Sequence, residues 1–172
     1  QRGQTIVGEE YSKADFPDNP EVVELPEFNA ATSEIYKKLE EAGRNLLKAI
    51  ATYLELPEDY FEKYVINGNS ILRAIHYFPI ENPDAISPEA VRAGAHEDIN
   101  LITLLIGASA DGLEVLTKDN EWFPIRAKGK DIVVNVGDML QRLTNNKLKS
   151  TTHRVVNPPR ELMGTSRFSV PF

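Results

Sequence analysis

Three side chains in this sequence have the types and spacing of a metal-binding set: His96, Asp98 and, much farther along the chain, His153. In an extended strand alternate side chains share a face, so His96 and Asp98 would point one way and Glu97 the other. Asp98 is therefore the expected carboxylate ligand. Two neutral imidazoles and one carboxylate on one triangular face can hold Fe(II) and leave its other face open for a substrate and dioxygen.

A second pair of polar side chains lies near the end of the sequence, in Arg167-Phe168-Ser169. Strand alternation would put Arg167 and Ser169 on one face and Phe168 on the other. A guanidinium binds a carboxylate through two parallel hydrogen bonds and keeps its charge, so Arg167 and Ser169 are candidates for holding one carboxylate group. The spacing alone equally allows an arginine in an edge strand that faces water.

The composition is that of one globular domain with enough apolar residues for a core, since the 172 residues are 41% hydrophobic and 26% charged. The net charge of −7 makes nucleic acid an unfavourable partner. There is no cysteine, so a metal site must use histidine and carboxylate ligands. No apolar run approaches the ~18 residues of a membrane span, so we expect no membrane partner and a cytoplasmic protein. The sequence specifies no oligomeric state, and a monomer is compatible with it.

The first elements along the chain are predicted to be helical. Residues 1–27 are polar and contain several prolines, and we expect this N-terminal segment to be irregular. Apolar residues then recur at three- and four-residue steps, which predicts an amphipathic helix from about Asn29 that ends at Glu55–Pro57. Pro57 and the two acidic residues after it predict a second short helix to about Tyr64. The apolar stripe of the first helix consists of Ile35, Leu39, Ala42, Leu46, Ile50 and Tyr53, and Leu47 and Leu54 widen it.

After Ser70 the pattern becomes that of short β-strands separated by turns. The predicted strands lie at residues 71–78, 100–106, 113–116, 121–125, 132–136, 151–156 and 167–170. Two of the separating turns are Ala110–Gly112 and Lys118–Asn120. Short strands at regular intervals predict an all-β sandwich or barrel, with the helices packed outside it.

Five segments, in this order and spacing, resemble the isopenicillin N synthase-like 2-oxoglutarate/Fe(II) dioxygenases: Gly94–Leu105, Asn135–Leu140, Leu143–Asn146, Thr152–Asn157 and Arg167–Ser169. The resemblance covers about residues 25–172. It implies a mainly β fold with flanking α-helices, the cupin-like jelly roll or double-stranded β-helix. Residues 28–172 would then be a single domain of a helix pair and a jelly-roll catalytic core. Family members are longer, so we expect further residues near Glu10–Tyr11 and beyond both termini.

The resemblance also implies a chemistry for the polar residues. Iron would be held by His96, Asp98 and His153, and Arg167 and Ser169 would hold the distal carboxylate of 2-oxoglutarate. Decarboxylation of this co-substrate to succinate and carbon dioxide would be coupled, through dioxygen, to hydroxylation or desaturation of a small-molecule substrate, an activity that ascorbate can support. The protein's own part is then orientation and the exclusion of water.

One segment departs from the family pattern. Plant members often read Asn-Tyr-Tyr-Pro where this chain reads His76-Tyr77-Phe78-Pro79. The second tyrosine hydroxyl, a candidate contact of the co-substrate, is therefore absent, and Tyr77 is the remaining candidate pocket residue. For His76, the third histidine, we favour a structural role.

Three other functions would use the same residues differently. An oxidase like isopenicillin N synthase keeps the iron ligands but uses Arg167 and Ser169 for the carboxylate of its substrate, without 2-oxoglutarate. A non-catalytic jelly-roll protein would only bind a ligand, although the complete ligand set argues against an unused site. A zinc hydrolase also uses two histidines and one carboxylate.

Overall fold

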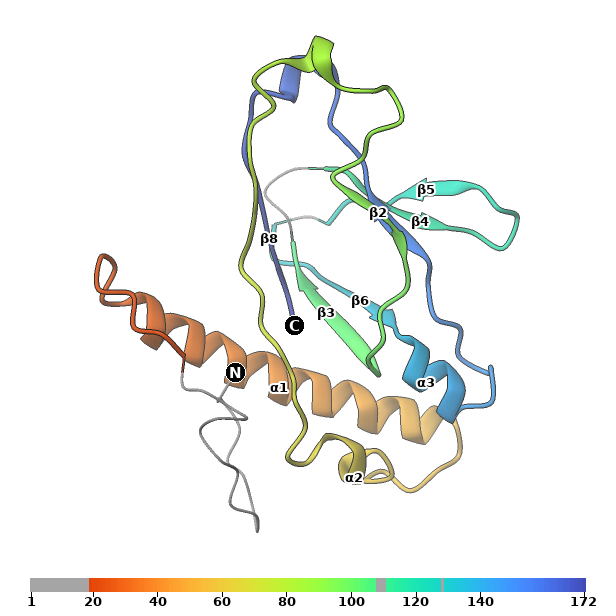
Figure 1. The fold of residues 1–172 in the computed structure, drawn as a ribbon. Coiled ribbons are helices and arrows are strands. Elements are labelled where there is room, and N and C mark those ends of the chain that lie inside the picture. Colours follow the sequence, from red (N-terminus) through yellow and green to blue (C-terminus); the bar gives the residue numbers. More distant parts are fainter. Residues whose placement is uncertain (1–18, 108–110, 128) are drawn as a thin grey trace. The chain divides into compact units, whose positions relative to one another are not determined.

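The computed structural model describes residues 19–107, 111–127 and 129–172 and contains two compact units (Figure 1). One unit runs to Leu72 and includes Phe172, and the other runs from Arg73 to Pro171. The region near Glu10–Tyr11 lies outside the described residues, and so does most of the segment predicted to be irregular. Its described part, residues 19–27, contains turns and no helix or strand.

The long helix α1 (Phe28–Tyr53) confirms the predicted amphipathic helix, and Leu39 and Leu47 are buried as predicted, but the rest of the buried face lies one residue after the predicted stripe. The buried residues are Tyr36, Leu39, Gly43, Leu47 and Ala51. The buried face is shifted because Tyr36 packs edge-on against Phe172, with ring centroids 5.0 Å apart. Tyr53, which was expected in the buried stripe, is 77% exposed. The helix ends as predicted, since Glu55 adopts a left-handed conformation with φ 59° just before Pro57.

The second helix, α2 (Glu62–Val65), begins later than predicted. Pro57 does not start it, because the backbone after Pro57 makes turns in which the N–H groups of Tyr60 and Glu62 donate to carbonyls three residues earlier. This turn buries the side chain of Phe61, which is 2% exposed. The predicted turn after the helix is confirmed at Asn67, whose φ is 53°.

The unit from Arg73 to Pro171 is built from two four-stranded antiparallel sheets, which confirms the predicted jelly roll. In each sheet the neighbouring strands are mostly distant in sequence, as the jelly-roll topology requires. One sheet has the order β1 (Ile75–Tyr77), β8 (Arg167–Pro171), β3 (Ile102–Ile106) and β6 (Ile132–Val136). The other has the order β2 (Ala93–His96), β7 (His153–Val155), β4 (Leu113–Leu116) and β5 (Trp122–Pro124).

The sheets explain why the apolar runs of the sequence become strands. The longest ladder pairs β3 with β6 from Ile102↔Val136 to Ile106↔Ile132, and Leu104 in it is 1% exposed. The hairpin predicted around Lys118–Asn120 joins β4 to β5, with Asn120 in a left-handed conformation. Of the other predicted turn, Ala110 lies outside the described residues, and Gly112 has φ 126°.

A third α-helix, α3 (Asp138–Leu143), was not predicted. The Gly137-Asp138 pair indicated only the end of a strand, and six residues are too few for a helical period to stand out. The unit also contains two short 3₁₀ helices, Pro83–Ala85 and Arg160–Leu162.

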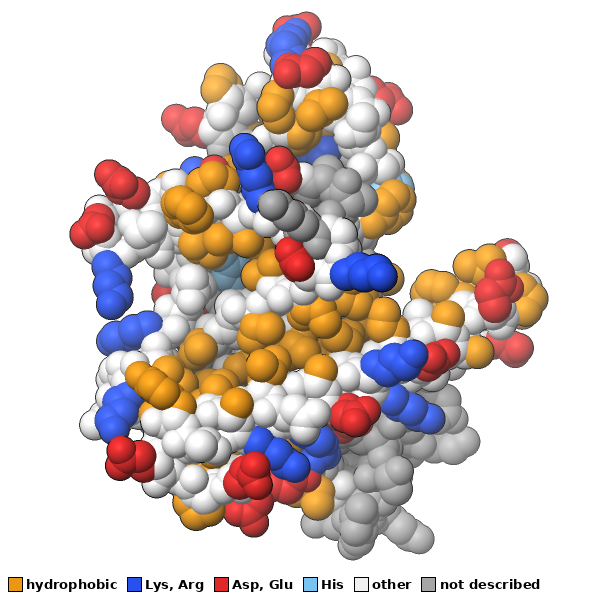
Figure 2. Space-filling model, turned by 180° about the vertical axis from the view of Figure 1, so that it is seen from behind, with side chains coloured by type: hydrophobic (Ala, Val, Ile, Leu, Met, Phe, Trp, Pro, Cys, Tyr) orange, Lys and Arg blue, Asp and Glu red, His pale blue; other side chains and the backbone are white. Residues whose placement is uncertain are grey.

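On the face drawn in Figure 2, acidic and basic side chains are interspersed and hydrophobic side chains gather between them. Exposed large hydrophobic residues of the chain include Phe78, Phe123 and Phe168. Among the residues that the structure describes, no helix is long and apolar enough to cross a membrane.

Candidate active site

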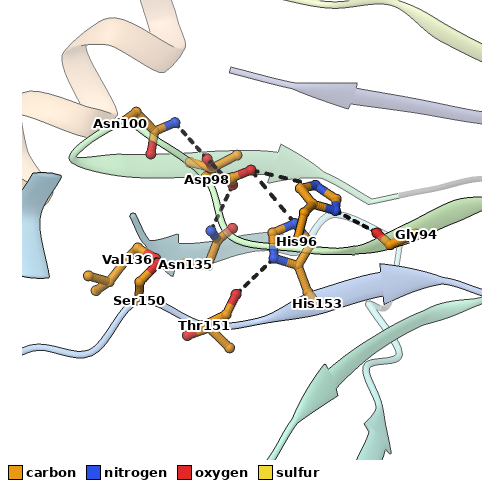
Figure 3. A network of polar contacts seen from close by, with 10 residues as sticks. Gly94, His96, Asp98, Asn100, Asn135, Val136, Ser150, Thr151 and His153 are labelled. Atoms are coloured by element: carbon orange, nitrogen blue, oxygen red, sulfur yellow. Dashed lines mark hydrogen bonds and ion pairs between the residues drawn. The ribbon is translucent and has the colours of Figure 1, made fainter. Parts of the chain in front are cut away.

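His96, Asp98 and His153 come together at one end of the second sheet (Figure 3). His96 ends β2 and lies opposite His153, which begins β7. The Nε2 atoms of both imidazoles lie 3.8 Å from Oδ1 of Asp98, and the three ligand atoms are within 4.8 Å of one another. All three ligand atoms could therefore bind one metal ion.

The position of Asp98 differs from the strand geometry expected from the sequence. Strand β2 ends at His96, so Asp98 lies in the loop that follows rather than at an alternate position of the strand. It nevertheless faces the two imidazoles, whereas Glu97 accepts a hydrogen bond of 2.6 Å from the hydroxyl of Thr152. Contacts from other strands must therefore orient Asp98.

Two hydrogen bonds hold the other oxygen of Asp98. Oδ2 accepts from the hydroxyl of Thr103 at 2.6 Å and from Nδ2 of Asn135 at 2.9 Å. The Thr103 hydroxyl in turn accepts from Nδ2 of Asn100 at 2.8 Å. Oδ1 is thus left facing the imidazoles, and Oδ2 is anchored to β3 and β6.

The backbone of the Asp98 loop is held by the junction between β6 and α3. Asp138 N–H donates to the carbonyl of Asp98 at 2.8 Å, and Gly137 N–H donates to the carbonyl of Leu101 at 2.9 Å. A Cβ atom on Gly137 would lie 2.3 Å from the carbonyl oxygen of Asn100. Only glycine allows the Asp98 loop and the β6–α3 junction to approach this closely. This requirement explains the glycine within Asn135–Leu140, one of the five segments that carry the family resemblance.

The two imidazoles are oriented by backbone carbonyls. Nδ1 of His96 lies 2.7 Å from the carbonyl oxygen of Gly94, and Nδ1 of His153 lies 2.9 Å from that of Thr151. A carbonyl oxygen can only accept, so Nδ1 carries the proton in each ring. In the neutral tautomer Nε2 then presents a lone pair toward Asp98, which is the arrangement that metal-binding histidines require.

The carboxyl of Asp98 is stabilised as an anion. Burial acts most strongly and by itself would raise its pKa. The hydrogen bonds from Thr103 and Asn135, together with the nearby imidazoles of His153 and His96, outweigh that effect, so the pKa of Asp98 is lowered. A charged carboxylate oxygen and two imidazole nitrogens form a donor set that fits a divalent metal ion, Fe(II) included.

Arg167 and Ser169 lie on the buried face of β8, as strand alternation predicts. They are 2% and 5% exposed, whereas Phe168 between them is 52% exposed. Strand β8 lies between β1 and β3, so the alternative of a water-facing arginine in an edge strand is wrong. Burial is the main reason that the pKa of Arg167 is lowered, and the charge of Arg92 acts in the same direction.

Tyr77 lies directly opposite Arg167 in the β1–β8 ladder. Cross-strand partners share a face of the sheet, and Cζ of Arg167 is 5.0 Å from the centroid of the Tyr77 ring. Arg167 also lines a cavity between the two sheets. The other lining residues are Leu105, Gly107, Asp111, Leu113, Ile125, Ala127 and Val133. The cavity thus combines aliphatic side chains with the charged groups of Asp111 and Arg167, and the buried cation of Arg167 suits a short aliphatic ligand that ends in a carboxylate.

The segment that departs from the family pattern has its other side chains on the opposite face. The His76 ring stacks on Phe168, with centroids 4.4 Å apart and planes at 15°, and its Nε2 lies 2.9 Å from the hydroxyl of Ser166. Phe78 packs beside His76 and is 73% exposed. These contacts support a structural role for His76, and they show that a hydroxyl at position 78 would lie outside the cavity.

Sequence reasoning assigned no role to Thr103, Asn135 or Asn100. A signal was present for all three, because Asn100 and Thr103 fall inside Gly94–Leu105 and Asn135 begins Asn135–Leu140, two of the segments that carried the family resemblance. The contact itself was not readable, since Asn135 comes from a strand distant in sequence and Thr103, although near in sequence, lies beyond the loop that follows β2.

Comparison with protein families gives one match over more than half of the chain. The model of the 2OG-Fe(II) oxygenase superfamily matches residues 68–172. The 2-oxoglutarate-Fe(II) type oxidoreductase ppzD of Metarhizium rileyi is 34% identical over 157 residues, which are 89% of this chain and 44% of that protein. The proline hydroxylase buaE of Petromyces alliaceus is 38% identical over 138 residues, which are 78% of this chain and 43% of that protein.

Solved structures give the same result. A 2OG-Fe(II) oxygenase family protein from Caulobacter crescentus has a TM-score of 0.84 and 47% identity, covering 97% of this chain and 53% of the other. A full-length Neurospora crassa protein in complex with alpha-KG has a TM-score of 0.82 and 34% identity, covering 89% and 51%. The chain therefore spans about half the length of the relatives that it matches.

Proposed function

Because this chain belongs to the 2OG-Fe(II) oxygenase superfamily, we propose that it forms the catalytic core of a non-haem Fe(II) dioxygenase that uses 2-oxoglutarate to hydroxylate or desaturate a small organic substrate. The observation that carries the proposal is the convergence of His96, Asp98 and His153, with both Nε2 atoms directed at Oδ1 of Asp98. Within the superfamily, the five sequence segments described above support the isopenicillin N synthase-like branch.

The metal ligands in this proposal are Nε2 of His96, Nε2 of His153 and Oδ1 of Asp98. The carbonyls of Gly94 and Thr151 fix the imidazole tautomers, so neither histidine has to rotate or exchange a proton before it binds. His96 is the most exposed of the three side chains at 49%, against 15% for His153, so the open side of the site lies by His96.

The co-substrate residues in this proposal are Arg167, Ser169 and Tyr77. Arg167 and Ser169 would bind the distal carboxylate of 2-oxoglutarate from the buried face of β8, and Tyr77 would cover the guanidinium. The aliphatic side chains that line the adjoining cavity would contact the aliphatic part of the co-substrate.

Bound iron and 2-oxoglutarate would supply the oxidation chemistry, in which dioxygen is consumed, succinate and carbon dioxide are released and ascorbate can keep the metal reduced. The protein contributes the orientation of the ligands, a buried cation for the co-substrate and a cavity that is partly lined by aliphatic side chains. This division is typical of enzymes in which the cofactor performs the redox step.

The proposal is tested by measuring oxygen uptake together with succinate release, with Fe(II) and ascorbate present and 2-oxoglutarate present or omitted. The relatives suggest the first compounds for the screen: proline, because one is named a proline hydroxylase, and thymine, because the Neurospora crassa protein was also solved in complex with it. Succinate release that depends on 2-oxoglutarate and stops in His153→Ala supports the proposal. Oxygen uptake with a substrate but without any need for 2-oxoglutarate would replace it with an oxidase.

A further inference from the structure

The two oxygens of the Asp98 carboxylate have different surroundings. Oδ1 lies 3.8 Å from the Nε2 atoms of His96 and His153 and accepts none of the hydrogen bonds found among the described residues around it. Oδ2 accepts two, from Thr103 at 2.6 Å and from Asn135 at 2.9 Å. The structure thus separates one oxygen that faces the proposed metal from one that is held by the protein.

We propose that Thr103 and Asn135 are positioning residues that make Asp98 a one-oxygen metal ligand. The inference rests on the proposed function, because it assigns them a role toward the metal site formed by His96, Asp98 and His153. A carboxylate that offered both oxygens would occupy one more position on the metal, so a tied Oδ2 leaves that position open for the co-substrate and dioxygen.

The geometry of the two donors, Thr103 and Asn135, is fixed by the β1–β8–β3–β6 sheet. Thr103 and Asn135 are direct partners in the β3–β6 ladder, so their side chains leave the same face at a constant separation. Asn100 donates to the Thr103 hydroxyl, and this directs the hydroxyl proton toward Asp98 instead of away from it. Both donors therefore reach Oδ2 in an orientation that requires no further adjustment.

Asp98 needs these donors because its own backbone is not in a strand. β2 ends at His96, and Asp98 occupies the loop between β2 and β3. The junction at Gly137 and Asp138 holds the loop backbone, but it leaves the side chain free to rotate about χ1 and χ2. The hydrogen bonds that the Asp98 side chain accepts from the described residues go to Oδ2, and they fix which oxygen points at the imidazoles.

The test is binding of Co(II), a spectroscopic substitute for Fe(II), to the purified metal-free protein. Thr103→Val removes the hydroxyl at nearly constant volume, Thr103→Ser keeps it, and Asn135→Leu removes the second donor. Outer hydrogen-bond partners of metal ligands are worth about 10- to 100-fold in affinity, so we expect Thr103→Val and Asn135→Leu each to weaken Co(II) binding by roughly that factor. We expect Thr103→Ser to restore most of it. The Co(II) absorption bands should also change in the two weakened variants, because the coordination number rises when Asp98 offers both oxygens.

The control is Thr32→Val in helix α1, which removes a threonine hydroxyl that donates to the carbonyl of Phe28, and it should bind Co(II) like the wild type. Unchanged affinity and spectrum in folded Thr103→Val and Asn135→Leu would overturn the inference while leaving the proposed function intact. If Thr103→Val does not fold, Asn135→Leu decides by the same criterion. Wild-type protein that binds Co(II) no better than His96→Ala would overturn the proposed metal site itself.

Discussion

His96 and His153 lie directly opposite each other in the β2–β7 ladder, with ring centroids 4.4 Å apart. Sheet pairing therefore brings together two imidazoles that are distant in the sequence, without a shared loop or helix. The register of this pair shifts between Ala93 and His96, so the ladder is irregular just where the site is formed. Such irregularities are common beside functional sites.

Replacing His96 with alanine should abolish specific metal binding. The variant loses one of three ligand atoms, so its affinity for Fe(II) should fall by more than the roughly 100-fold that removal of a mere hydrogen-bond partner can cause. Anaerobic titration with Fe(II), followed by calorimetry, measures the loss. His76→Ala is the matched control, since His76 stacks on Phe168 on the outer face of the sheet, and it should retain wild-type affinity.

Replacing Arg167 with lysine should weaken binding of 2-oxoglutarate while leaving Fe(II) binding unchanged. Lysine keeps the charge but loses the planar fork that binds a carboxylate twice. One lost hydrogen bond to a charged group costs about 1.5–3 kcal/mol, which is roughly a 10- to 150-fold loss of affinity. Anaerobic titration of the Fe(II) protein with 2-oxoglutarate checks this, and Arg160→Lys, at an exposed ion pair with Asp84, serves as control. Equal affinities in the two variants would remove Arg167 from the co-substrate site.

Replacing Gly137 with alanine should destabilise the protein. The new Cβ would meet the carbonyl oxygen of Asn100 at 2.3 Å and that of Asp98 at 2.8 Å, and backbone atoms cannot move aside as a side-chain end can. We expect a loss of about 1–3 kcal/mol in the free energy of unfolding, together with weaker metal binding because the Asp98 loop is displaced. Urea unfolding measures the first effect. Gly164→Ala, where a Cβ has nothing within 4 Å, should be close to neutral.

The stability of the protein should fall at alkaline pH in part because of Tyr36. Burial, followed by the charge of Glu40, raises the pKa of Tyr36 above its ordinary value of 10. A folded-state pKa above the unfolded one means that the contribution to stability is complete below about pH 10 and is lost as the pH rises through the folded-state value. In Tyr36→Phe the decline above pH 10 should be smaller, at a cost of about 1 kcal/mol at neutral pH. Urea unfolding of Tyr36→Phe and of the wild type at pH 7, 10 and 11 measures this difference. If the free energies of unfolding of both proteins fall in parallel above pH 10, Tyr36 does not contribute to the alkaline loss of stability.

The sequence was sufficient for the parts of the fold that have a local cause. The apolar runs at residues 102–106 and 132–136 are strands because they pair with each other and bury residues such as Leu104. The alternation that placed Arg167 and Ser169 on one face is equally local, and the structure buries both. The convergence of the two histidines depended on the family resemblance, because a ladder between distant strands has no local signal.

The parts that could not be predicted depend on contacts between distant segments. Asp98 was expected in a strand, but β2 ends at His96, and the orientation of Asp98 comes from Thr103 and Asn135. The buried face of α1 is shifted by one residue because Tyr36 packs on Phe172 at the other end of the chain. Neither contact has a counterpart in local periodicity or spacing.

In the proposed function, one site binds both Fe(II) and 2-oxoglutarate. The decisive measurement is the visible spectrum of the anaerobic Fe(II) protein after addition of 2-oxoglutarate. We predict a weak charge-transfer band that saturates with one Fe(II) and one 2-oxoglutarate per chain and is absent in His153→Ala. Wild-type protein that binds Fe(II) but develops no band at saturating 2-oxoglutarate would show that 2-oxoglutarate does not bind at the iron site.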